Sequence, residues 1–496
     1  MAGRPQTTVS FREDTQSTFS LGVAKFAVQV VTERGVANQP KEVRTEREFI
    51  QYFGKITHPT AEEAVRALRK GAILIVNPLH KFTTGSTTGT KASVEITVGA
   101  ETLTVTANEV GEGYNGIIVK TSSPRSRKAD VVDLTISKGS EFSETVYDIP
   151  VSFTASVVIA INKKLLNVSL SISDTLTLAN TLTGTLASGA KDASTLLPAD
   201  IIAALNAAFE DFDFGDIFHI VNLFYADVEV DAAFVALAEA NKLSAHLPLP
   251  LNVSAVDAIA QREGTGSFMH QPINSMFAEY WMGQIEVRSI QDPTQIMDLH
   301  PMAEVMAAIT KKDAIGQWLS ASTAEFGRLD GDVLNARKFT NSELDQLYDA
   351  GINFVSRVSG LGVKLNGNNS LWRDKSQLAS KRNIGDLTIY NLRWTERLGN
   401  KYISKPSDIP TFREIYREAL ETINDLIARR AITEDYVWVG DQEATTLDDL
   451  VLNDKVKVQL GEYKIEFYVT PIGSLEQIGI ETVNTQGASA ASAVLL

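Results

Sequence analysis

The stretch that decides the fold is TAEEAVRALRKGAILIV, residues 60–76, in which a helical pattern passes directly into an apolar run. Thr60 and Glu63 have the spacing of a capping box, which predicts that a helix begins here. Gly71 follows the last apolar helical position and predicts the end of that helix. The apolar run 72–76 is typical of a strand covered on both faces. We therefore expect an α/β fold.

The alternation of helix and strand continues on both sides of this stretch. Helical patterns occur at 44–52, 198–209, 231–242, 301–309, 340–350 and 411–430, and strand-like runs at 23–31, 217–225, 352–358, 456–460 and 464–469. Two helices begin with further capping boxes, Thr340 with Glu343 and Thr411 with Glu414, and the helix at 411–430 is expected to be the longest. This alternation predicts an α/β (α+β) core domain with a mixed sheet and flanking helices, built from residues 21–80 and 196–475.

Residues 81–195 have a different character, because they are rich in Thr, Ser, Val and Gly. Short alternating runs at 92–98, 102–106 and 117–119 predict strands, and helical periodicity nearly vanishes. Exposed polar faces and frequent turns would suit the periphery of an assembly. We predict an inserted all-β domain.

The two ends of the chain lack the apolar residues needed to form a core of their own. Residues 1–20 are polar and predict an extended N-terminal arm. Residues 476–496 begin with a strand-like run and then become small and polar, which predicts a C-terminal strand followed by an arm. The isolated apolar residues of the two arms are Val9, Phe11, Ile478, Ile480 and Val483.

Composition and charge exclude several functional classes. The chain has 496 residues, no cysteine and a formal net charge of −15. Without cysteine it has no disulfide, no thiolate metal site and no cysteine nucleophile. The longest basic cluster, Arg125, Arg127 and Lys128, lies in a Ser/Pro turn without aromatic residues to stack on bases. No apolar run approaches the roughly 18 residues of a membrane span, so we expect a soluble protein that neither binds nucleic acid directly nor inserts into a membrane.

The glycine-rich motifs do not support a cofactor site. Gly111, Gly113 and Gly116 match the spacing of a dinucleotide fingerprint, but the residues after them predict a strand where the fingerprint requires a helix. We expect a tight turn instead. The glycines of 85–91 lack the spacing of a phosphate-binding loop and predict a flexible linker.

The titratable residues show no catalytic or metal-binding pattern. The six histidines, at positions 58, 80, 219, 246, 270 and 300, never have the spacing of a metal site, and we interpret His219 as a hydrogen-bonded core residue. Asp211, Asp213 and Asp216 lack the glycine and the terminal Glu of a calcium loop. No GxSxG nucleophile elbow occurs. We therefore predict no catalytic residue, no cofactor and no metal.

The helix predicted at 411–430 carries its charges opposite its apolar face. These charged residues include Arg413, Glu414, Arg417, Glu418, Glu421 and Asp425. Many of them are spaced three or four residues apart, where charges can pair, so a solvated face explains the pattern as well as a docking surface does. A docking surface of mixed charge would set the register of a partner without binding it tightly.

Several stretches together resemble the contractile tail sheath proteins of bacteriophages and related injection machines. The strongest is 312–321, KDAIGQWLSA, which has the family's charged pair, glycine and tryptophan, with Ser320 where proline is usual. Residues 341–353, NSELDQLYDAGIN, are similar to the family's helix leading into a Gly-Ile-Asn strand. Weaker matches keep the family's order at 34–54, 111–116, 387–398 and 445–480. The segment 360–370 departs from the family, because it lacks a Trp-Gly-Ala-Arg-Thr run.

The resemblance implies a structural subunit, not an enzyme, that forms stacked rings of six copies around an inner tube and contracts to drive the tube through a target envelope. It implies that the apolar residues of the two arms lie in strands added to the sheets of neighbouring copies. The six charged residues of the helix at 411–430 are expected to face the tube. Expected partners are other copies of the chain, the tail tube protein, and the baseplate and tail terminator proteins. The expected location is a virion tail assembled in the host cytoplasm, or a contractile injection particle.

Two other functions stay open on the sequence alone. Residues 81–194 are compatible with a β-rich virion or cell-surface adhesin. The α/β part is compatible with an enzyme, although no site is recognisable in it.

Overall fold

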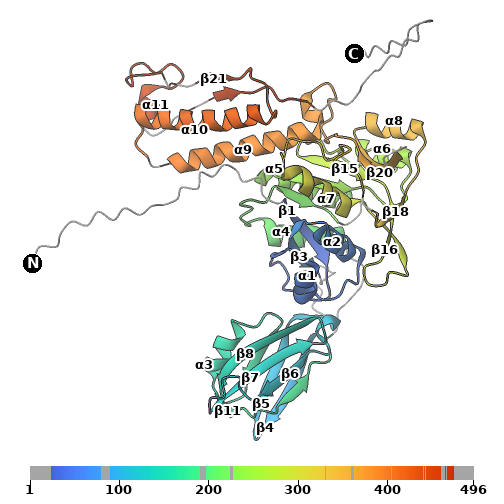
Figure 1. Cartoon of the computed structure of the whole chain (residues 1–496), viewed down its shortest axis with the longest axis vertical. Helices are drawn as coiled ribbons and strands as arrows, with labels where there is room; N and C mark the ends of the chain where they lie inside the picture. Colours follow the sequence, from blue (N-terminus) through green and yellow to red (C-terminus); the bar gives the residue numbers. More distant parts are fainter. Residues whose placement is uncertain are drawn as a thin grey trace, which may run out of the picture. The chain divides into compact units, whose positions relative to one another are not determined.

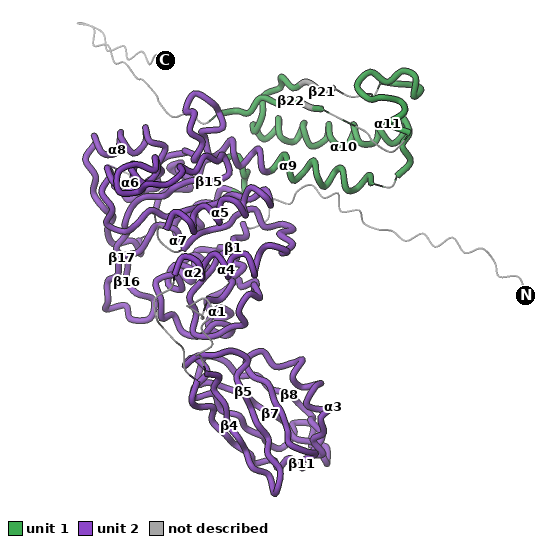
Figure 2. Tube along the Cα trace, turned by 180° about the vertical axis from the view of Figure 1, so that it is seen from behind, with its two compact units in different colours: residues 1–22, 313–318, 390–496 green, residues 23–312, 319–389 purple. Residues whose placement is uncertain are grey.

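The structure is a computed structural model. It describes residues 24–79, 90–189, 197–223, 227–329, 331–358, 362–403, 405–439, 441, 443–459, 464 and 466–473. Within these ranges the chain forms eleven α-helices and 22 strands. It divides into two compact units (Figure 2). Unit 2 consists of residues 23–312 and 319–389, and unit 1 includes residues 313–318 and the chain from residue 390 onward.

Unit 2 is built on an eight-stranded sheet (Figure 1). Its strands, in spatial order, are β2 (Lys41–Val43), β3 (Ile73–Leu79), β1 (Lys25–Val31), β13 (His219–Val221), β14 (Ser244–Pro248), β15 (Ala278–Met282), β19 (Asn353–Val358) and β20 (Gly362–Asn366). The six central strands pair in parallel, and the outer strands β2 and β20 are antiparallel to their neighbours. The predicted mixed sheet with flanking helices is therefore present.

Helices cover both faces of this sheet because successive residues of each strand point into two different cores. Phe26, Val28 and Val30 of β1 belong to a core shared with α1 (Glu46–Phe53), α2 (Pro59–Arg69) and α7 (Met302–Asp313). Ala27 and Val31 belong to a core shared with α4 (Pro198–Phe209), α5 (Val228–Asn241), α6 (Ala255–Glu263) and α8 (Asn341–Asp349). A second sheet, β17 (Ile296–Leu299), β16 (Ile285–Arg288) and β18 (Val333–Ala336), adds to the first core and was not predicted.

Two of the three predicted capping boxes are not formed, and the first of them is the box of Thr60 and Glu63. Helix α2 begins at Pro59, and the His58 imidazole caps it by accepting a hydrogen bond from Thr60 N at 3.2 Å. The Thr60 hydroxyl accepts from Val31 N of β1 instead, and Glu63 Oε1 accepts from His300 N. Tertiary partners have therefore replaced the local ones. The predicted box of Thr340 and Glu343 at the start of α8 is confirmed.

Residues 90–189 fold around a core of their own. Their main sheets are β10 (Val168–Ile172), β5 (Glu101–Val110) and β4 (Lys91–Val98), and β12 (Thr183–Thr185), β6 (Ile118–Ser122), β7 (Val131–Lys138) and β8 (Phe142–Pro150). The short strands β9 (Ser152–Phe153) and β11 (Leu176–Thr177) form a further pair. One helix, α3 (Ala155–Asn162), buries Val158 and Ile161 in this core. The segment is therefore mostly β, and the prediction that it is all-β was wrong at this helix.

A tight turn of this β-rich segment, residues 111–116, packs against residues 33–35 of unit 2. Gly111 and Gly116 have φ angles of 132° and 78°, which confirms the predicted turn, and a 3-10 helix, Glu112–Tyr114, lies between them. A Cβ added at Gly113 would lie 2.5 Å from Glu33 O, so only glycine permits this approach. The Tyr114 hydroxyl accepts a hydrogen bond from Gly35 N at 3.0 Å.

Unit 1 is dominated by two helices. Helix α9 (Arg382–Tyr402) begins in unit 2 and continues into unit 1, where α10 (Ile409–Ala428) follows it. With 21 residues against 20, α9 is longer than α10, so the prediction that α10 is the longest helix was wrong. The strand predicted at 456–460 was also wrong, because α11 (Lys455–Gln459) is a short helix. A two-stranded sheet, β21 (Val437–Val439) with β22 (Glu466–Tyr468), completes the described part of the unit.

Candidate functional site

The first candidate surface is the charged face of α10. The helix begins at Ile409, and Asp408 caps it by accepting a hydrogen bond from Thr411 N at 3.0 Å, so the capping box predicted at Thr411 and Glu414 was wrong. The apolar positions Ile409, Phe412, Ala419, Ile423 and Leu426 are buried. The six charged residues predicted to face a tube lie on the other sides of the helix and are exposed or half-buried.

Two of these six residues bind the preceding helix and the turn after it. Glu418 lies 2.8 Å from Lys401 Nζ and accepts a hydrogen bond from the Tyr402 hydroxyl at 2.8 Å, and Glu414 lies 3.4 Å from Lys405 Nζ. Partial burial would raise the pKa of Glu418, but its hydrogen bonds with Lys401 and Tyr402 lower it below the usual value. These two carboxylates therefore link α10 to the end of α9 and to the turn after it.

Two more of the six residues also have partners within unit 1. Arg413 Nη2 donates to Ala444 O at 2.9 Å, and Asp425 pairs with Arg429 at 3.0 Å. Arg417 and Glu421 are exposed and make no hydrogen bond or ion pair with any described residue. They are the members of the predicted set whose charges are best available to a partner.

The second predicted site, the strand-forming arms, lies outside the described residues. Val9, Phe11, Ile478, Ile480 and Val483 are all in segments for which the structure gives no placement. The described sheet of unit 1 has only the two strands β21 and β22, with an isolated bridge between Ile432 and Pro471 beside them. A two-stranded sheet is marginally stable alone, so added strands would stabilise it.

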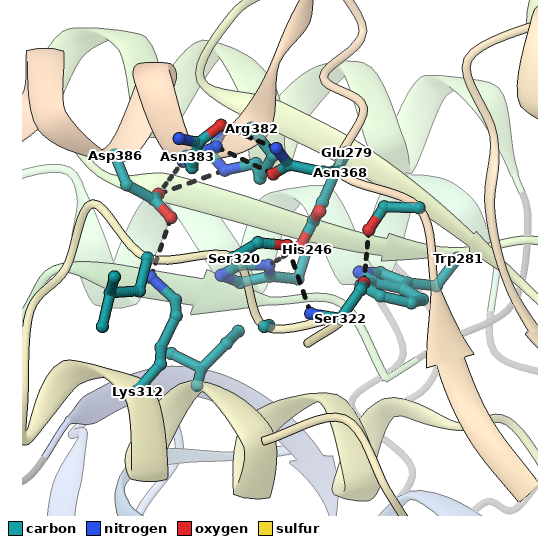
Figure 3. Close-up of a pocket in the computed structure, with 14 residues that line it drawn as sticks. His246, Glu279, Trp281, Lys312, Ser320, Ser322, Asn368, Arg382, Asn383 and Asp386 are labelled. Atoms are coloured by element: carbon teal, nitrogen blue, oxygen red, sulfur yellow. Dashed lines mark hydrogen bonds and ion pairs between the residues drawn. The ribbon is translucent and has the colours of Figure 1, made fainter. Parts of the chain in front are cut away.

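A row of buried polar side chains crosses the large sheet of unit 2, and Figure 3 shows two of its members, His246 and Glu279. His219 Nδ1 of β13 lies 3.0 Å from His246 Nε2 of β14, and His246 Nδ1 donates to Glu279 Oε1 of β15 at 2.6 Å. Glu279 Oε2 accepts from Asn353 Nδ2 of β19 at 2.8 Å. Burial lowers the pKa of His246, and its contact with Glu279 offsets this in part. A neutral His246 that accepts at Nε2 fits this chain of hydrogen bonds.

An ion cluster lies beside this row, at the start of α9 (Figure 3). Asp386 Oδ2 lies 3.0 Å from Lys312 Nζ of α7, and Asp386 Oδ1 accepts hydrogen bonds from Arg382 Nε at 3.1 Å and from the Ser244 hydroxyl at 2.6 Å. All four residues are buried. Burial would raise the pKa of Asp386, yet the charges of Arg382 and Lys312 hold it well below its usual range.

The position of the polar row argues for a structural role. His219, Asn353 and Ser244 are the first residues of their parallel strands, whereas ligands of open α/β sheets bind beyond the carboxyl ends of the strands. The expectation that His219 is a hydrogen-bonded core residue is confirmed. The pairing with His246 was missed, and adjacent parallel strands that each carry a histidine were the only signal for it.

The described residues offer few other chemical sites. No group of three or more histidine, aspartate or glutamate side chains within them is placed to hold a metal ion. Among the described helices, none is long and apolar enough to cross a membrane.

The fold is that of contractile sheath proteins. No protein-family model matches the sequence, and no curated protein matches it. Solved structures do match: the sheath tail protein Lin1278 from Listeria innocua has a TM-score of 0.59 at 14% identity, and the match covers 90% of this chain and 95% of that one.

Two further structures support the same fold. The sheath tail protein from Desulfitobacterium hafniense has a TM-score of 0.52 at 17% identity and covers 88% of this chain and 94% of its own. The contracted helical sheath of the anti-feeding prophage has a TM-score of 0.56 at 12% identity and covers 94% of both chains. The resemblance noted in the sequence is therefore confirmed for the fold.

Proposed function

We propose that this protein is the structural subunit of a contractile sheath. In this proposal the copies stack as rings of six around an inner tube, and contraction of the sleeve drives the tube through a target envelope. The observation that carries the proposal is that the likeness to sheath tail proteins covers 90% of the chain, so it includes both the mixed-sheet core and the helical unit. Electron microscopy of the purified protein tests it: hollow striated tubes are expected, and particles that never elongate would contradict it.

The proposal includes the two terminal arms as links between copies. A strand added to β21 or β22 would form a few ladder hydrogen bonds, each contributing about 0.5–1.5 kcal/mol net. Such links would keep neighbouring copies joined while their folded bodies rearrange. Among the described residues, β21 pairs only with β22, which supports unit 1 as the acceptor.

Truncation separates the arms from the folded body. Deletion of residues 1–18, or of residues 484–496, should leave a folded monomer that does not polymerise, because neither segment has the apolar residues needed to form a core of its own. Circular dichroism checks the fold, and electron microscopy checks polymerisation. Sleeves of normal appearance from either truncated chain would refute the role of that arm.

The proposal also places the charged face of α10 against the tube in the extended state. Arg417→Glu is the cleanest test, because Arg417 is exposed and makes no described hydrogen bond or ion pair. The variant should fold normally and lose tube-dependent assembly. Arg47→Glu, at an exposed position of α1 that the hypothesis does not include, is a matched control. Equal assembly of both variants on tubes would count against this face.

The expected partners follow from the same proposal. They are other copies of the chain, a tube protein, and baseplate and terminator proteins at the two ends of the sleeve. The particle would be a virion tail or a contractile injection device.

A further inference from the structure

The only described helix within the β-rich segment 90–189 exposes an apolar side. Helix α3 has no charged residue, and it buries only Val158 and Ile161. Ile159 is 60% exposed, although a helix that is apolar nearly all round is normally buried. Figures 1 and 2 view the chain from opposite sides, and both place α3 at the margin of the segment. The outer side of α3 is therefore available to a partner.

Two lysines at the end of α3 extend this apolar side. Lys163 follows Ile159 by four residues, so their side chains lie on the same side of the helix. Lys163 and Lys164 are exposed, and their side chains make no hydrogen bond or ion pair with any described residue. Leu166, just after them, is 44% exposed. Ile159, Lys163, Lys164 and Leu166 together form what we call the α3 patch.

Hydrogen bonds to two neighbouring strands hold the α3 patch in place. Asn162, the last residue of α3, donates to Leu170 O of β10 at 2.9 Å and accepts from Leu170 N at 2.8 Å. Glu144 of β8 accepts hydrogen bonds from Leu166 N at 3.1 Å and from the side-chain amide of Asn167. The backbone beneath the patch is therefore fixed, and a partner would meet side chains that are already oriented.

The size and the charge of the α3 patch favour one kind of partner. A stable interface between two proteins buries about 800 Å² on each side, which four side chains at one helix end do not supply. A lipid bilayer accepts a smaller contact, because apolar side chains enter the headgroup region while lysines attract anionic headgroups. The net charge of −15 opposes such binding, but salt screens charges more than about 8 Å away. The local lysines therefore dominate.

We propose that the α3 patch is a contact site for the surface of an anionic lipid bilayer. Ile159 and Leu166 enter the headgroup region, and Lys163 and Lys164 lie against negatively charged headgroups. The helix rests on the bilayer and does not cross it. One patch binds weakly, so many copies presented together bind a bilayer much more tightly than a single copy does.

A fluorescent label tests whether this site, and not another, meets the bilayer. The chain has no cysteine, so Ile159→Cys carries a single environment-sensitive fluorophore. Its emission should shift to shorter wavelength when vesicles of phosphatidylserine and phosphatidylcholine are added, because the label leaves water. Val256→Cys on α6 is the matched control, since Val256 is also an exposed apolar helix residue and lies outside the patch. Its label should not respond.

Vesicle flotation measures the binding of unlabelled chains to the same vesicles. The double variant Lys163→Ala, Lys164→Ala should bind about thirtyfold more weakly than the parent chain, and Ile159→Ser about tenfold more weakly. These side chains are exposed, so circular dichroism should show a normal fold for both variants. The control replaces two exposed lysines outside the patch, Lys120→Ala with Lys457→Ala, and should change binding little.

Several results would overturn the proposal. They are no binding of the parent chain to anionic vesicles, equal binding to vesicles of phosphatidylcholine alone, or equal responses of the two labels. The patch would instead serve a second copy of the chain if Ile159→Ser weakened self-association in analytical ultracentrifugation while the parent chain ignored vesicles. Because the vesicle experiments do not require sleeves to form, their failure would leave the sheath proposal untouched, and absence of tubes would leave the bilayer contact untouched.

Discussion

Replacement of Arg34 by alanine should weaken the contact between the β-rich segment 90–189 and the core of unit 2. The guanidinium of Arg34 is fully buried, lies 3.0 Å from Glu141 and donates to Ile50 O at 2.8 Å. It also stacks over the Phe142 ring at 4.5 Å. Burial lowers the pKa of Arg34, and the charge of Glu141 opposes this shift. Among the described residues, no other ion pair between the β-rich segment and the rest of unit 2 is as buried at both of its side chains.

The size of the effect follows from what Glu141 retains. Removal of one partner of a buried ion pair costs about 3–5 kcal/mol. Glu141 keeps Lys138 at 3.5 Å and Lys55 at 3.8 Å, so its charge is not left unpaired. We therefore expect the lower end, about 3 kcal/mol, for Arg34→Ala.

Hydrogen exchange of the native chain measures this local opening without requiring two-state unfolding. Amides of residues 138–142 should exchange roughly a hundredfold faster in the Arg34→Ala variant, because about 1.4 kcal/mol corresponds to a factor of ten. Lys128→Ala, which removes an exposed pair with Asp148, is the control and should change exchange little. An increase below about fivefold for Arg34→Ala would refute the reasoning that this ion pair holds the junction.

Two further predictions concern the stability of unit 2. Burial raises the pKa of Asp231 to about 7, whereas in the unfolded chain it ionises above about pH 4. The folded protein therefore holds the Asp231 proton more tightly than the unfolded chain does. The free energy of unfolding should fall as the pH rises from about 4 to about 7, and Asp231 should cause no further change above that pH. Urea unfolding of Asp231→Asn should show a gain over the parent that grows across this window, and a pH-independent difference would contradict it. Thr340→Ala should destabilise α8 by about 1 kcal/mol through loss of its cap, with Ser342→Ala nearly neutral; equal effects in thermal unfolding would contradict this.

Local sequence patterns predicted the elements well wherever local interactions also decide them. The box of Thr340 and Glu343 formed as expected because both residues are on the surface, where no tertiary group competes. Thr60 and Glu63 have the same spacing, but they are buried and hydrogen-bond to Val31 and to His300, which lies 237 residues further along the chain. No local pattern could reveal these partners.

The strand propensity of the residues was also misleading at α3, which is a helix. The segment ASVVIAIN, residues 155–162, has no charged residue and contains four β-branched residues, which favour strands. It is a helix because Val158 and Ile161, three positions apart, fill the core of the β-rich segment.

The polar row and the ion cluster could not be predicted from the sequence for a topological reason. Lys312 and Asp386 are 74 residues apart, and His246 and Glu279 are 33 apart. They meet because parallel strands and their crossover helices bring distant segments to one end of the sheet. The charged face of α10 was predicted correctly as a face, but its use by Lys401, Tyr402 and Lys405 required the structure.

The most direct test of the sheath proposal is a cryo-electron microscopy reconstruction of whatever the full-length protein forms at high concentration. The account predicts a hollow helical sleeve with six copies in each ring, in which residues 1–20 and 476–496 of each copy rest on adjacent copies. A closed particle without helical symmetry, or a sleeve in which both ends fold back onto their own copy, would contradict it.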